Sequence, residues 1–266
     1  MPKKRIIFTL LYDSQSEHFL LSRNFRVQEV GDYNWLKENY DFTNLSYYID
    51  ELLVIDVSRK KRNSQRFCSM LKKLSSDCFL PIGAGGGLDS LDKAKMLFDS
   101  GADKLILNTS VYENPELIKA LNKFYGQQAI IASVDIKKNE LGIFDIYTHN
   151  GTKKASSLKD YQNIICKNEW IGELYLNSME RDGTGQGYDF NMLKSFTNLN
   201  KKHPIILAGG AGKTSHIVEG LLTDGVDACA TAHLFNFIGD KLAKTRCIAK
   251  ANGISLGEWL PKASLS

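Results

Sequence analysis

The sequence contains little of what would define a secreted, membrane or metal-binding protein. Its five cysteines among 266 residues are scattered, without Cys-x-x-Cys spacing, at Cys68, Cys78, Cys166, Cys229 and Cys247. An odd and dispersed set of this kind argues against a zinc site or a disulfide framework and predicts a reducing, cytoplasmic location. No apolar run approaches the roughly 18 residues of a membrane span, and no signal peptide is visible, so we expect no membrane association.

An excess of charge of one sign is also absent. The net charge of +4 is too small to indicate nucleic-acid binding by itself, and we expect no nucleic-acid partner. A basic run, Ser58-Arg59-Lys60-Lys61-Arg62, is typical of a solvated loop, although a minority of such runs contact an anionic ligand. No histidine and carboxylate cluster has metal-ligand spacing, and no serine or cysteine triad is indicated, so we expect no metal or other cofactor.

Two glycine-rich turns follow short apolar runs. Residues 204–213 read Pro-Ile-Ile-Leu-Ala-Gly-Gly-Ala-Gly-Lys, and residues 81–87 read Pro-Ile-Gly-Ala-Gly-Gly-Gly. Such glycines permit positive φ and close approach of the backbone to a ligand, and a helix that follows directs free N–H groups and its positive dipole end at an anion. Each turn therefore predicts a phosphate site, although glycine also makes ordinary turns.

The two turns belong to an internal repeat. Gly85 and Gly209 are 124 positions apart, and further segments recur in the same order at nearly the same offset: Ile6-Ile7 with Ile130-Ile131, Leu11 with Asp135, Glu51-Leu52 with Glu173-Leu174, and residues 100–103 with 224–227. Four such pairs, in the same order and at nearly the same offset, indicate a duplicated half.

Eight apolar runs predict strands, at Arg5–Leu11, Leu52–Val57, Leu80–Ala84, Lys104–Leu107, Ala129–Val134, Leu174–Leu176, Ile205–Ala208 and Ala228–Ala230. Helical patterns lie between most of them, such as Leu91–Phe98 and Pro115–Phe124, the latter with Asn114 as its N-cap. Short strands buried on both faces and alternating with helices form parallel sheets. We therefore predict one (β/α)8 barrel domain over residues 1–266, built from two repeated half-barrels. An open doubly wound sheet is the alternative, which the repeat disfavours.

In such a barrel the functional residues lie after the carboxyl ends of the strands. The first glycine turn would adjoin Asn108-Thr109 and the second Ala232-His233, so two phosphate sites on opposite sides of the mouth predict a bis-phosphorylated ligand. Asp135 ends an apolar strand, where a carboxylate must point into the mouth or find a partner, and we predict a catalytic role for it. Asp182 is predicted to be an acid, a base or a hydroxyl contact, with an Asx-type turn as the alternative. Residues 12–33 are predicted to be mostly irregular, as a lid or a plain surface loop.

Eight motifs together resemble the cyclase subunit of imidazole glycerol phosphate synthase, from Lys4 to about Phe237: Lys4-Arg5-Ile6-Ile7, Gly85-Gly86-Gly87, Gly101-Ala102-Asp103-Lys104, Asn108-Thr109, Glu113-Asn114-Pro115, Arg181-Asp182-Gly183-Thr184, Gly187-Tyr188-Asp189 and Gly209-Gly210-Ala211-Gly212-Lys213. The resemblance implies a heterodimer with a glutaminase, whose ammonia passes through the barrel to a bis-phosphorylated ribulosyl aminoimidazole-carboxamide. The implied products are imidazole glycerol phosphate and aminoimidazole-carboxamide ribotide (AICAR).

The resemblance also assigns roles to individual residues. It places phosphate contacts at Gly86, Gly87, Asn108 and Thr109 on one side and at Gly209, Gly210, Ala232 and His233 on the other, where His233 replaces a serine-like position. It matches Asp182 to a substrate-contacting aspartate and Asp135 to one of two catalytic aspartates. At the opposite end, an ammonia entrance of four charges falls on Arg5, Glu51, Lys104 and Glu173, and Asp103 faces the glutaminase.

Leu11 departs from the family pattern, because the second catalytic aspartate belongs at this position and leucine cannot transfer a proton. Asp13 could substitute only if the first strand continues that far. Leu11 and the Leu-Asn-Ser of residues 176–178 fit a paralogous branch associated with surface-sugar synthesis, in which the barrel supplies ammonia for making an acetamidino sugar. Two hypotheses follow: a cyclase that uses Asp135, or an ammonia-conducting partner of a sugar-modifying enzyme. A third, a phosphosugar isomerase barrel, has no use for the charged entrance.

Overall fold

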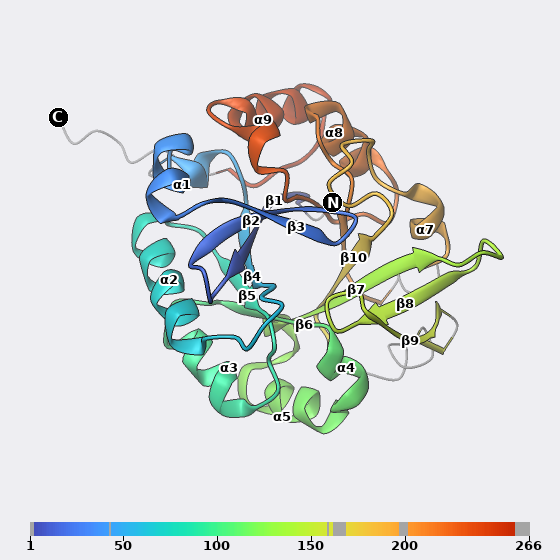
Figure 1. The fold of residues 1–266 in the computed structure, drawn as a ribbon. Coiled ribbons are helices and arrows are strands. Elements are labelled where there is room, and N and C mark those ends of the chain that lie inside the picture. Colours follow the sequence, from blue (N-terminus) through green and yellow to red (C-terminus); the bar gives the residue numbers. More distant parts are fainter. Residues whose placement is uncertain (1–2, 43, 159, 162–168, 197–201, 259–266) are drawn as a thin grey trace.

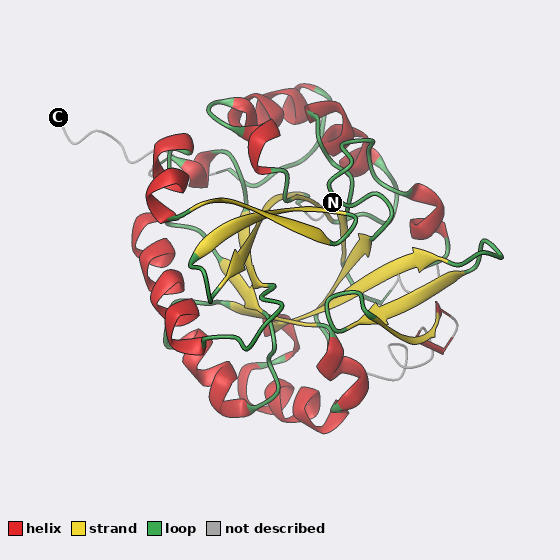
Figure 2. Cartoon of the chain, in the orientation of Figure 1, coloured by secondary structure: helices red, strands yellow, loops and turns green. Residues whose placement is uncertain are grey.

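Eight parallel strands close into a barrel, and the helices form a ring around it (Figures 1 and 2). The structure is a computed structural model, which describes residues 3–42, 44–158, 160–161, 169–196 and 202–258. The barrel strands, in spatial order, are β1 (Arg5–Asp13), β4 (Glu51–Asp56), β5 (Ile82–Gly85), β6 (Lys104–Leu107), β7 (Ile130–Lys138), β10 (Glu173–Ser178), β11 (Ile205–Ala208) and β12 (Ala228–Thr231). Parallel pairing of β12 with β1 and of β7 with β10 completes the closed circle, which confirms the predicted (β/α)8 barrel.

The outer ring contains helices of 5 to 14 residues. They are α1 (Tyr33–Asn39), α2 (Ser64–Asp77), α3 (Leu91–Phe98), α4 (Thr109–Glu113), α5 (Pro115–Tyr125), α7 (Phe190–Lys194), α8 (Thr214–Leu222) and α9 (Lys241–Ala251), with short 3-10 turns η1 (Leu45–Tyr47), η2 (Gln127–Ala129) and η3 (Leu234–Phe237). The predicted helices are confirmed, because α3 has the expected bounds and α5 differs by one residue. Asn114 caps α5 as predicted, since its side-chain oxygen accepts a hydrogen bond from Leu117 N at 3.1 Å.

Alternation along the strands separates two apolar layers. Ile7, Leu53, Ile106, Ile131 and Ile206 belong to one buried cluster, which fills the barrel interior. Their neighbours along the strands belong to a larger cluster that includes residues of the surrounding helices. Because both faces of each strand are buried, the strands read as nearly continuous apolar runs, and this is why the sequence located them within a few residues.

The internal repeat is visible in the hydrogen bonds at the amino ends of the strands. Asp103, just before β6, accepts a hydrogen bond from Ile82 N at 2.8 Å through its side chain. Asp227, just before β12, accepts the equivalent bond from Ile205 N at 2.9 Å. An aspartate at the equivalent position of each half therefore links two neighbouring strands, β6 to β5 in the first half and β12 to β11 in the second.

The prediction that residues 12–33 are mostly irregular is wrong. Strand β1 continues to Asp13, and the chain then forms a hairpin of β2 (His18–Arg23) and β3 (Arg26–Gly31), which lies across the front of the barrel in Figure 1. Its two-residue turn places Asn24 and Phe25 at φ 51° and 63°, as a type I′ hairpin requires. Phenylalanine is unusual at such a position, so Asn24-Phe25 does not read as a hairpin turn in the sequence.

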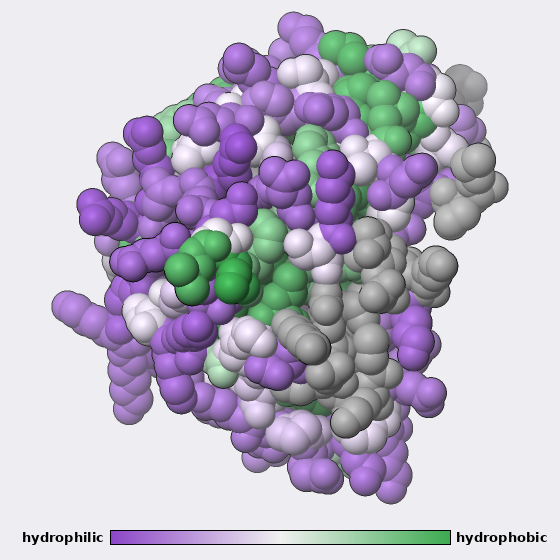
Figure 3. All heavy atoms as spheres, turned by 90° about the vertical axis from the view of Figure 1, so that its right-hand side faces the viewer, coloured by the Kyte–Doolittle hydropathy of each residue, from purple (hydrophilic) through white to green (hydrophobic). Residues whose placement is uncertain are grey.

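The second half repeats this arrangement. Strand β7 also runs on into two antiparallel strands, β8 (Phe144–Thr148) and β9 (Lys153–Ser157), which project from the barrel at the right of Figure 1. The face on this side is largely hydrophilic, with separate small apolar patches (Figure 3). In both halves, therefore, the first strand is long and carries a hairpin over the carboxyl end of the barrel.

Candidate functional site

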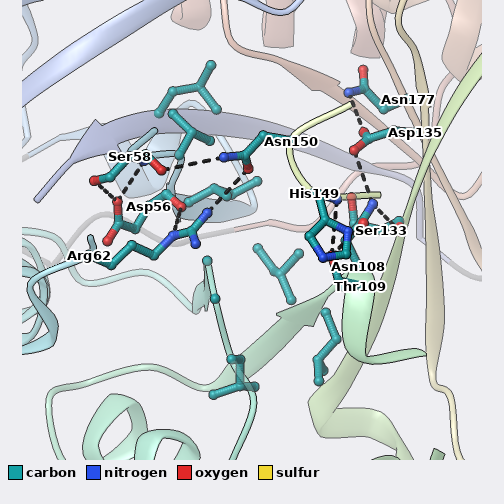
Figure 4. A pocket seen from close by; sticks show the side chains of 18 of the residues that line it. Asp56, Ser58, Arg62, Asn108, Thr109, Ser133, Asp135, His149, Asn150 and Asn177 are labelled. Carbon is teal, nitrogen blue, oxygen red and sulfur yellow. Dashed lines mark hydrogen bonds between the residues drawn. The ribbon is translucent and has the colours of Figure 1, made fainter. Parts of the chain in front are cut away.

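A cavity of about 580 Å³ opens at the carboxyl ends of the barrel strands (Figure 4). We call this cavity the mouth. It brings together eight of the positions singled out from the sequence: Leu11, Gly86, Gly87, Asn108, Thr109, Asp135, Asp182 and Ala232. Four others, Asp13, Gly209, Gly210 and His233, are not among the described residues that line it. The first glycine turn and both expected catalytic positions thus share one cavity, whereas most of the second phosphate site lies outside it.

Asp135 is held from both sides by neutral amides. Asn108 Nδ2 donates to its Oδ2 at 3.1 Å, and Asn177 Nδ2 donates to its Oδ1 at 3.0 Å (Figure 4). Burial raises the pKa of Asp135 to about 7, against the opposing effect of the Asn177 hydrogen bond and with a smaller contribution from the charge of Asp182. A carboxyl group with such a pKa can both accept and donate a proton near neutral pH, as general acid–base chemistry requires.

Replacing Asp135 with asparagine is expected to stabilise the fold at pH 8 but not at pH 4, relative to the parent chain. Because its pKa is raised in the folded state, ionisation of Asp135 removes stability as the pH rises from about 4 to about 7. The gain at pH 8 is at most about 4 kcal/mol, since each pKa unit corresponds to about 1.4 kcal/mol. Urea unfolding of both proteins at the two pH values measures it. A stability difference that does not change between pH 4 and pH 8 would contradict the raised pKa.

Leu11 lines the mouth, and Asp13 does not take its place there. Strand β1 continues through Asp13, so both side chains lie on the same face of the strand. The Asp13 carboxylate, however, accepts hydrogen bonds from Ser58 Oγ and Gln15 N, both at 2.8 Å. The mouth therefore has a leucine at the position that the family resemblance assigns to a second carboxylate.

Asp182 accepts hydrogen bonds from the β2–β3 hairpin at and next to its tip. Its Oδ2 accepts hydrogen bonds from Ser22 Oγ and from Phe25 N, the latter at 3.0 Å, and its backbone oxygen accepts one from Asn24 N at 2.9 Å. Burial raises the pKa of Asp182, although these hydrogen bonds act in the opposite direction. The approach of the hairpin requires glycine at the next residue, because a Cβ on Gly183 would lie 1.8 Å from Ser22 O.

Arginines from the basic run hold a second turn over the mouth. Arg59 Nη1 donates to Asn150 O at 3.0 Å, and its Nη2 donates to Phe25 O of the hairpin tip. Arg62 Nη2 donates to Asn150 Oδ1 at 3.3 Å. His149 and Asn150 both line the mouth, and sequence reasoning missed them because β8 and β9 were not predicted. The Asn150-Gly151 pair was the available signal, since Asn-Gly is typical of hairpin turns.

The second glycine turn packs against another loop. Gly187 N donates to Gly210 O at 2.8 Å, and a Cβ on Gly210 would lie 2.2 Å from Gly187 O. Beside the turn, Gly212 N donates to His216 Nδ1 at 3.3 Å. His233 Nδ1 is buried without a hydrogen-bond partner among the described residues, and burial lowers the pKa of this histidine. The turn is thus supported by protein contacts, and His233 retains one unpaired nitrogen.

Four charged residues meet at the opposite end of the barrel, and each is the first residue of its strand. Arg5 Nη1 lies 2.7 Å from Glu51, Lys104 Nζ lies 3.0 Å from Glu51 and 2.6 Å from Glu173, and Arg5 Nη2 also pairs with Glu173. Burial disfavours the charge on Glu173, but Arg5 and Lys104 outweigh it and lower the pKa of that carboxyl. Two cations and two carboxylates form a neutral charge ring, the arrangement that buried charge requires.

Within the described part of the chain, no group of three or more His, Cys, Asp or Glu side chains is arranged to hold a metal ion. In the same residues, no helix combines the length and the apolar character needed to cross a membrane.

The fold and the site together define a (β/α)8-barrel protein with a polar mouth at one end and a neutral charge ring at the other. The chain belongs to the histidine biosynthesis protein family, whose model matches residues 40–239. A relative from Parasynechococcus marenigrum, provisionally named imidazole glycerol phosphate synthase subunit hisF2, is 44% identical over 262 residues, which cover 97% of this chain and 95% of the relative.

Two further relatives are named imidazole glycerol phosphate synthase subunit HisF. That of Leptospira biflexa is 32% identical over 208 residues, covering 78% of this chain and 81% of the relative. That of Chlorobium limicola is 33% identical over 206 residues, covering 77% and 81%. The family resemblance found in the sequence motifs is thereby confirmed.

Proposed function

We propose that this chain is the ammonia-accepting, cyclase-type subunit of a glutamine amidotransferase of the imidazole glycerol phosphate synthase type. The observation that carries the proposal is the neutral charge ring of Arg5, Glu51, Lys104 and Glu173 at the opposite end of the barrel from Asp135. A neutral ring would admit uncharged ammonia without attracting free ions, and we infer that the ammonia would then pass along the barrel axis to the mouth. The acceptor would be a bis-phosphorylated ribulosyl aminoimidazole-carboxamide, and the products imidazole glycerol phosphate and AICAR.

In the mouth, the first glycine turn with Asn108 and Thr109 would hold one phosphate, through the backbone groups of Gly86 and Gly87. Gly209, Gly210, Ala232 and His233 would hold the other, with the unpaired Nδ1 of His233 as an additional donor. Asp182 would bind a ligand hydroxyl after release of the hairpin tip. Asp135, with a pKa of about 7, would move the proton during ring closure.

The glutaminase would dock at the end of the barrel that carries the charge ring. Three apolar side chains near this end are unusually exposed: Phe79 (91%), Phe124 (67%) and Leu222 (56%). Each follows or ends a helix and precedes a barrel strand, so all three lie toward the amino ends of the strands. Exposed aromatic and aliphatic side chains around a charged centre are typical of a protein interface.

The docking surface is tested by charge reversal at Asp103. Asp103→Lys is expected to weaken binding to a glutaminase of the imidazole glycerol phosphate synthase type by at least about tenfold, because a rim charge of the wrong sign is repelled across the interface. Calorimetric titration with the purified glutaminase measures the affinity. Asp227→Lys is the matched control, since it breaks the equivalent bond to a backbone N–H in the other half. Equal losses in both variants would assign Asp103 a structural role alone and count against this docking surface.

A second candidate function is favoured by Leu11. If the mouth does not convert the ribulosyl ligand, the chain would act as an ammonia-conducting partner of a sugar-modifying enzyme that makes an acetamidino group for a surface polysaccharide. Two observations support this alternative. The mouth has Leu11 where a second carboxylate would be needed, and Asp13, the nearby carboxylate, accepts a hydrogen bond from Ser58 instead of lining the mouth. Ammonium-dependent turnover distinguishes the two functions.

A further inference from the structure

A second cavity of about 390 Å³ adjoins the mouth and lies between α3 and the amino-terminal half of α2, and we call it the side pocket. Lys61, Phe67, Cys68, Lys93 and Met96 line it and do not line the mouth. Its volume lies within the range of small-molecule sites, roughly 300–1,000 Å³. Gly86 and Gly87 line both cavities, but neither the family resemblance nor the proposed function gives a role to these five residues, which line the side pocket but not the mouth.

The walls of the side pocket carry an excess of positive charge. Lys60, Lys61, Arg62 and Lys93 line it, and its two carboxylates are both engaged. Asp89 pairs with Lys93 at 2.7 Å, and Asp56 is buried and accepts a hydrogen bond from the backbone N–H of Ser58 at 3.0 Å. No salt bridge between described residues involves the other three cations. Four cations against two carboxylates leave an excess of two positive charges around one concave site, which favours an anion.

The base of the side pocket is apolar. Phe67, Cys68 and Leu97 are buried beneath it, and Met96 on α3 is 37% exposed. Cys68 Sγ lies 3.7 Å from Met96 O, which ties α2 to α3 at this point. An anion alone would leave this apolar surface in contact with water, whereas a compact apolar group attached to the anion would cover it.

Arg62 lies between the side pocket and the mouth and lines both of them, and one of its guanidinium nitrogens makes no hydrogen bond to the described residues. Its Nε donates to Asp56 O at 3.1 Å and its Nη2 to Asn150 Oδ1 at 3.3 Å, whereas Nη1 has no partner among the described residues. A Cβ on Gly87 would lie 3.0 Å from Nη1, so the guanidinium rests against the glycine turn that divides the two cavities. An anion in the side pocket would therefore meet a preorganised arginine whose position the rest of the fold fixes.

We propose that the side pocket binds a phosphate monoester that carries a compact apolar group, at a site separate from the ligand in the mouth. The phosphate would contact Lys60, Lys61 and Arg62, and the apolar group would lie on Phe67 and Met96. The proposal depends only on these contacts and holds whichever function the mouth performs.

Calorimetric titration of the full chain with phenyl phosphate tests the proposal, with inorganic phosphate as the probe that lacks the apolar group. We expect phenyl phosphate to bind more tightly than inorganic phosphate. Lys61→Glu should weaken its binding by about tenfold or more, because an attractive charge becomes a repulsive one. Lys72→Glu, the same change at an exposed position of α2 outside both cavities, should leave binding within about twofold of the parent. Met96→Trp should exclude phenyl phosphate by filling the apolar base.

Three results would overturn the proposal. One is an absence of phenyl phosphate binding to the parent chain at millimolar concentration. A second is an equal effect of the Lys61→Glu and Lys72→Glu substitutions, which would reveal only general electrostatic attraction. The third is loss of binding in Leu11→Trp, which fills the mouth, together with retention in Met96→Trp, because the probe would then occupy the mouth. Thermal melts of all variants establish that each one is folded before titration.

Discussion

Replacing Leu11 with aspartate is expected to raise ammonium-dependent turnover of the bis-phosphorylated ribulosyl substrate by about 10²–10⁴-fold, the usual contribution of one general acid–base group. Leu11 lines the mouth and is the repeat partner of Asp135, so a carboxylate there would face the same cavity from the opposite half-barrel. Formation of imidazole glycerol phosphate by the purified chain in excess ammonium salt, without a glutaminase, measures the rate.

Leu11→Asn is the matched control, because it introduces a polar group of nearly the same shape that cannot transfer a proton. Parent activity equal to that of Leu11→Asp would mean that Asp135 suffices and that the leucine has no catalytic consequence. Inactivity of both proteins, with ligand binding retained, would contradict the cyclase proposal and favour the ammonia-conducting alternative. A rise in Leu11→Asp that is absent in Leu11→Asn would mean an otherwise complete mouth lacking one proton-transfer group.

Removal of one carboxylate from the charge ring is expected to cost a large part of the stability of the fold. Glu51 has a side chain that is 2% exposed and pairs with both Arg5 and Lys104. Glu51→Ala leaves these two cations with Glu173 as their common partner, and breaking a buried ion pair in this way typically destabilises by about 3–5 kcal/mol. Urea unfolding at pH 7 measures the loss.

A double variant tests whether charge imbalance is the cause. Glu51→Ala combined with Lys104→Ala leaves one cation and one carboxylate, so the ring is neutral again. The double variant should then lose less stability than the sum of the two single variants. Asp240→Ala, which breaks an exposed pair with Lys244, should change stability little and serves as the surface control. Strict additivity of the two ring substitutions would mean that packing, not charge balance, accounts for the loss.

The barrel could be predicted from the sequence because it leaves two clear patterns there: one lies within each strand, and the other recurs at a fixed distance along the chain. Strands buried on both faces give apolar runs, and a duplication at a fixed offset makes each half support the interpretation of the other. Asp103 and Asp227 illustrate this, since the same offset that relates them in the sequence relates two equivalent hydrogen bonds in the fold. The hairpin at residues 18–31 escaped prediction because Phe25 adopts a left-handed conformation that its residue type does not suggest.

The mouth was predicted only in part. Asp135 could be identified because a carboxylate at the end of an apolar strand is conspicuous, and its place on the rim follows from the fold. Its two amide partners, Asn108 and Asn177, are 27 and 42 positions away in the chain, and no local pattern joins them. Arg62 and Asn150 are 88 positions apart and meet only because β8 and β9 fold back over the mouth. Contacts of this kind depend on tertiary structure and leave no short-range trace.

The hairpin tip has a consequence for how tightly any substrate can be held. Ser22 and Phe25 already satisfy Asp182 Oδ2, so a substrate hydroxyl that uses this oxygen must displace part of the chain itself. The protein thus carries an internal competitor, present at fixed effective concentration and independent of dilution. Apparent affinity is the intrinsic affinity multiplied by the fraction of molecules whose tip is released. A partner that bound the hairpin away from Asp182 would therefore raise the apparent affinity for the substrate without contacting the substrate.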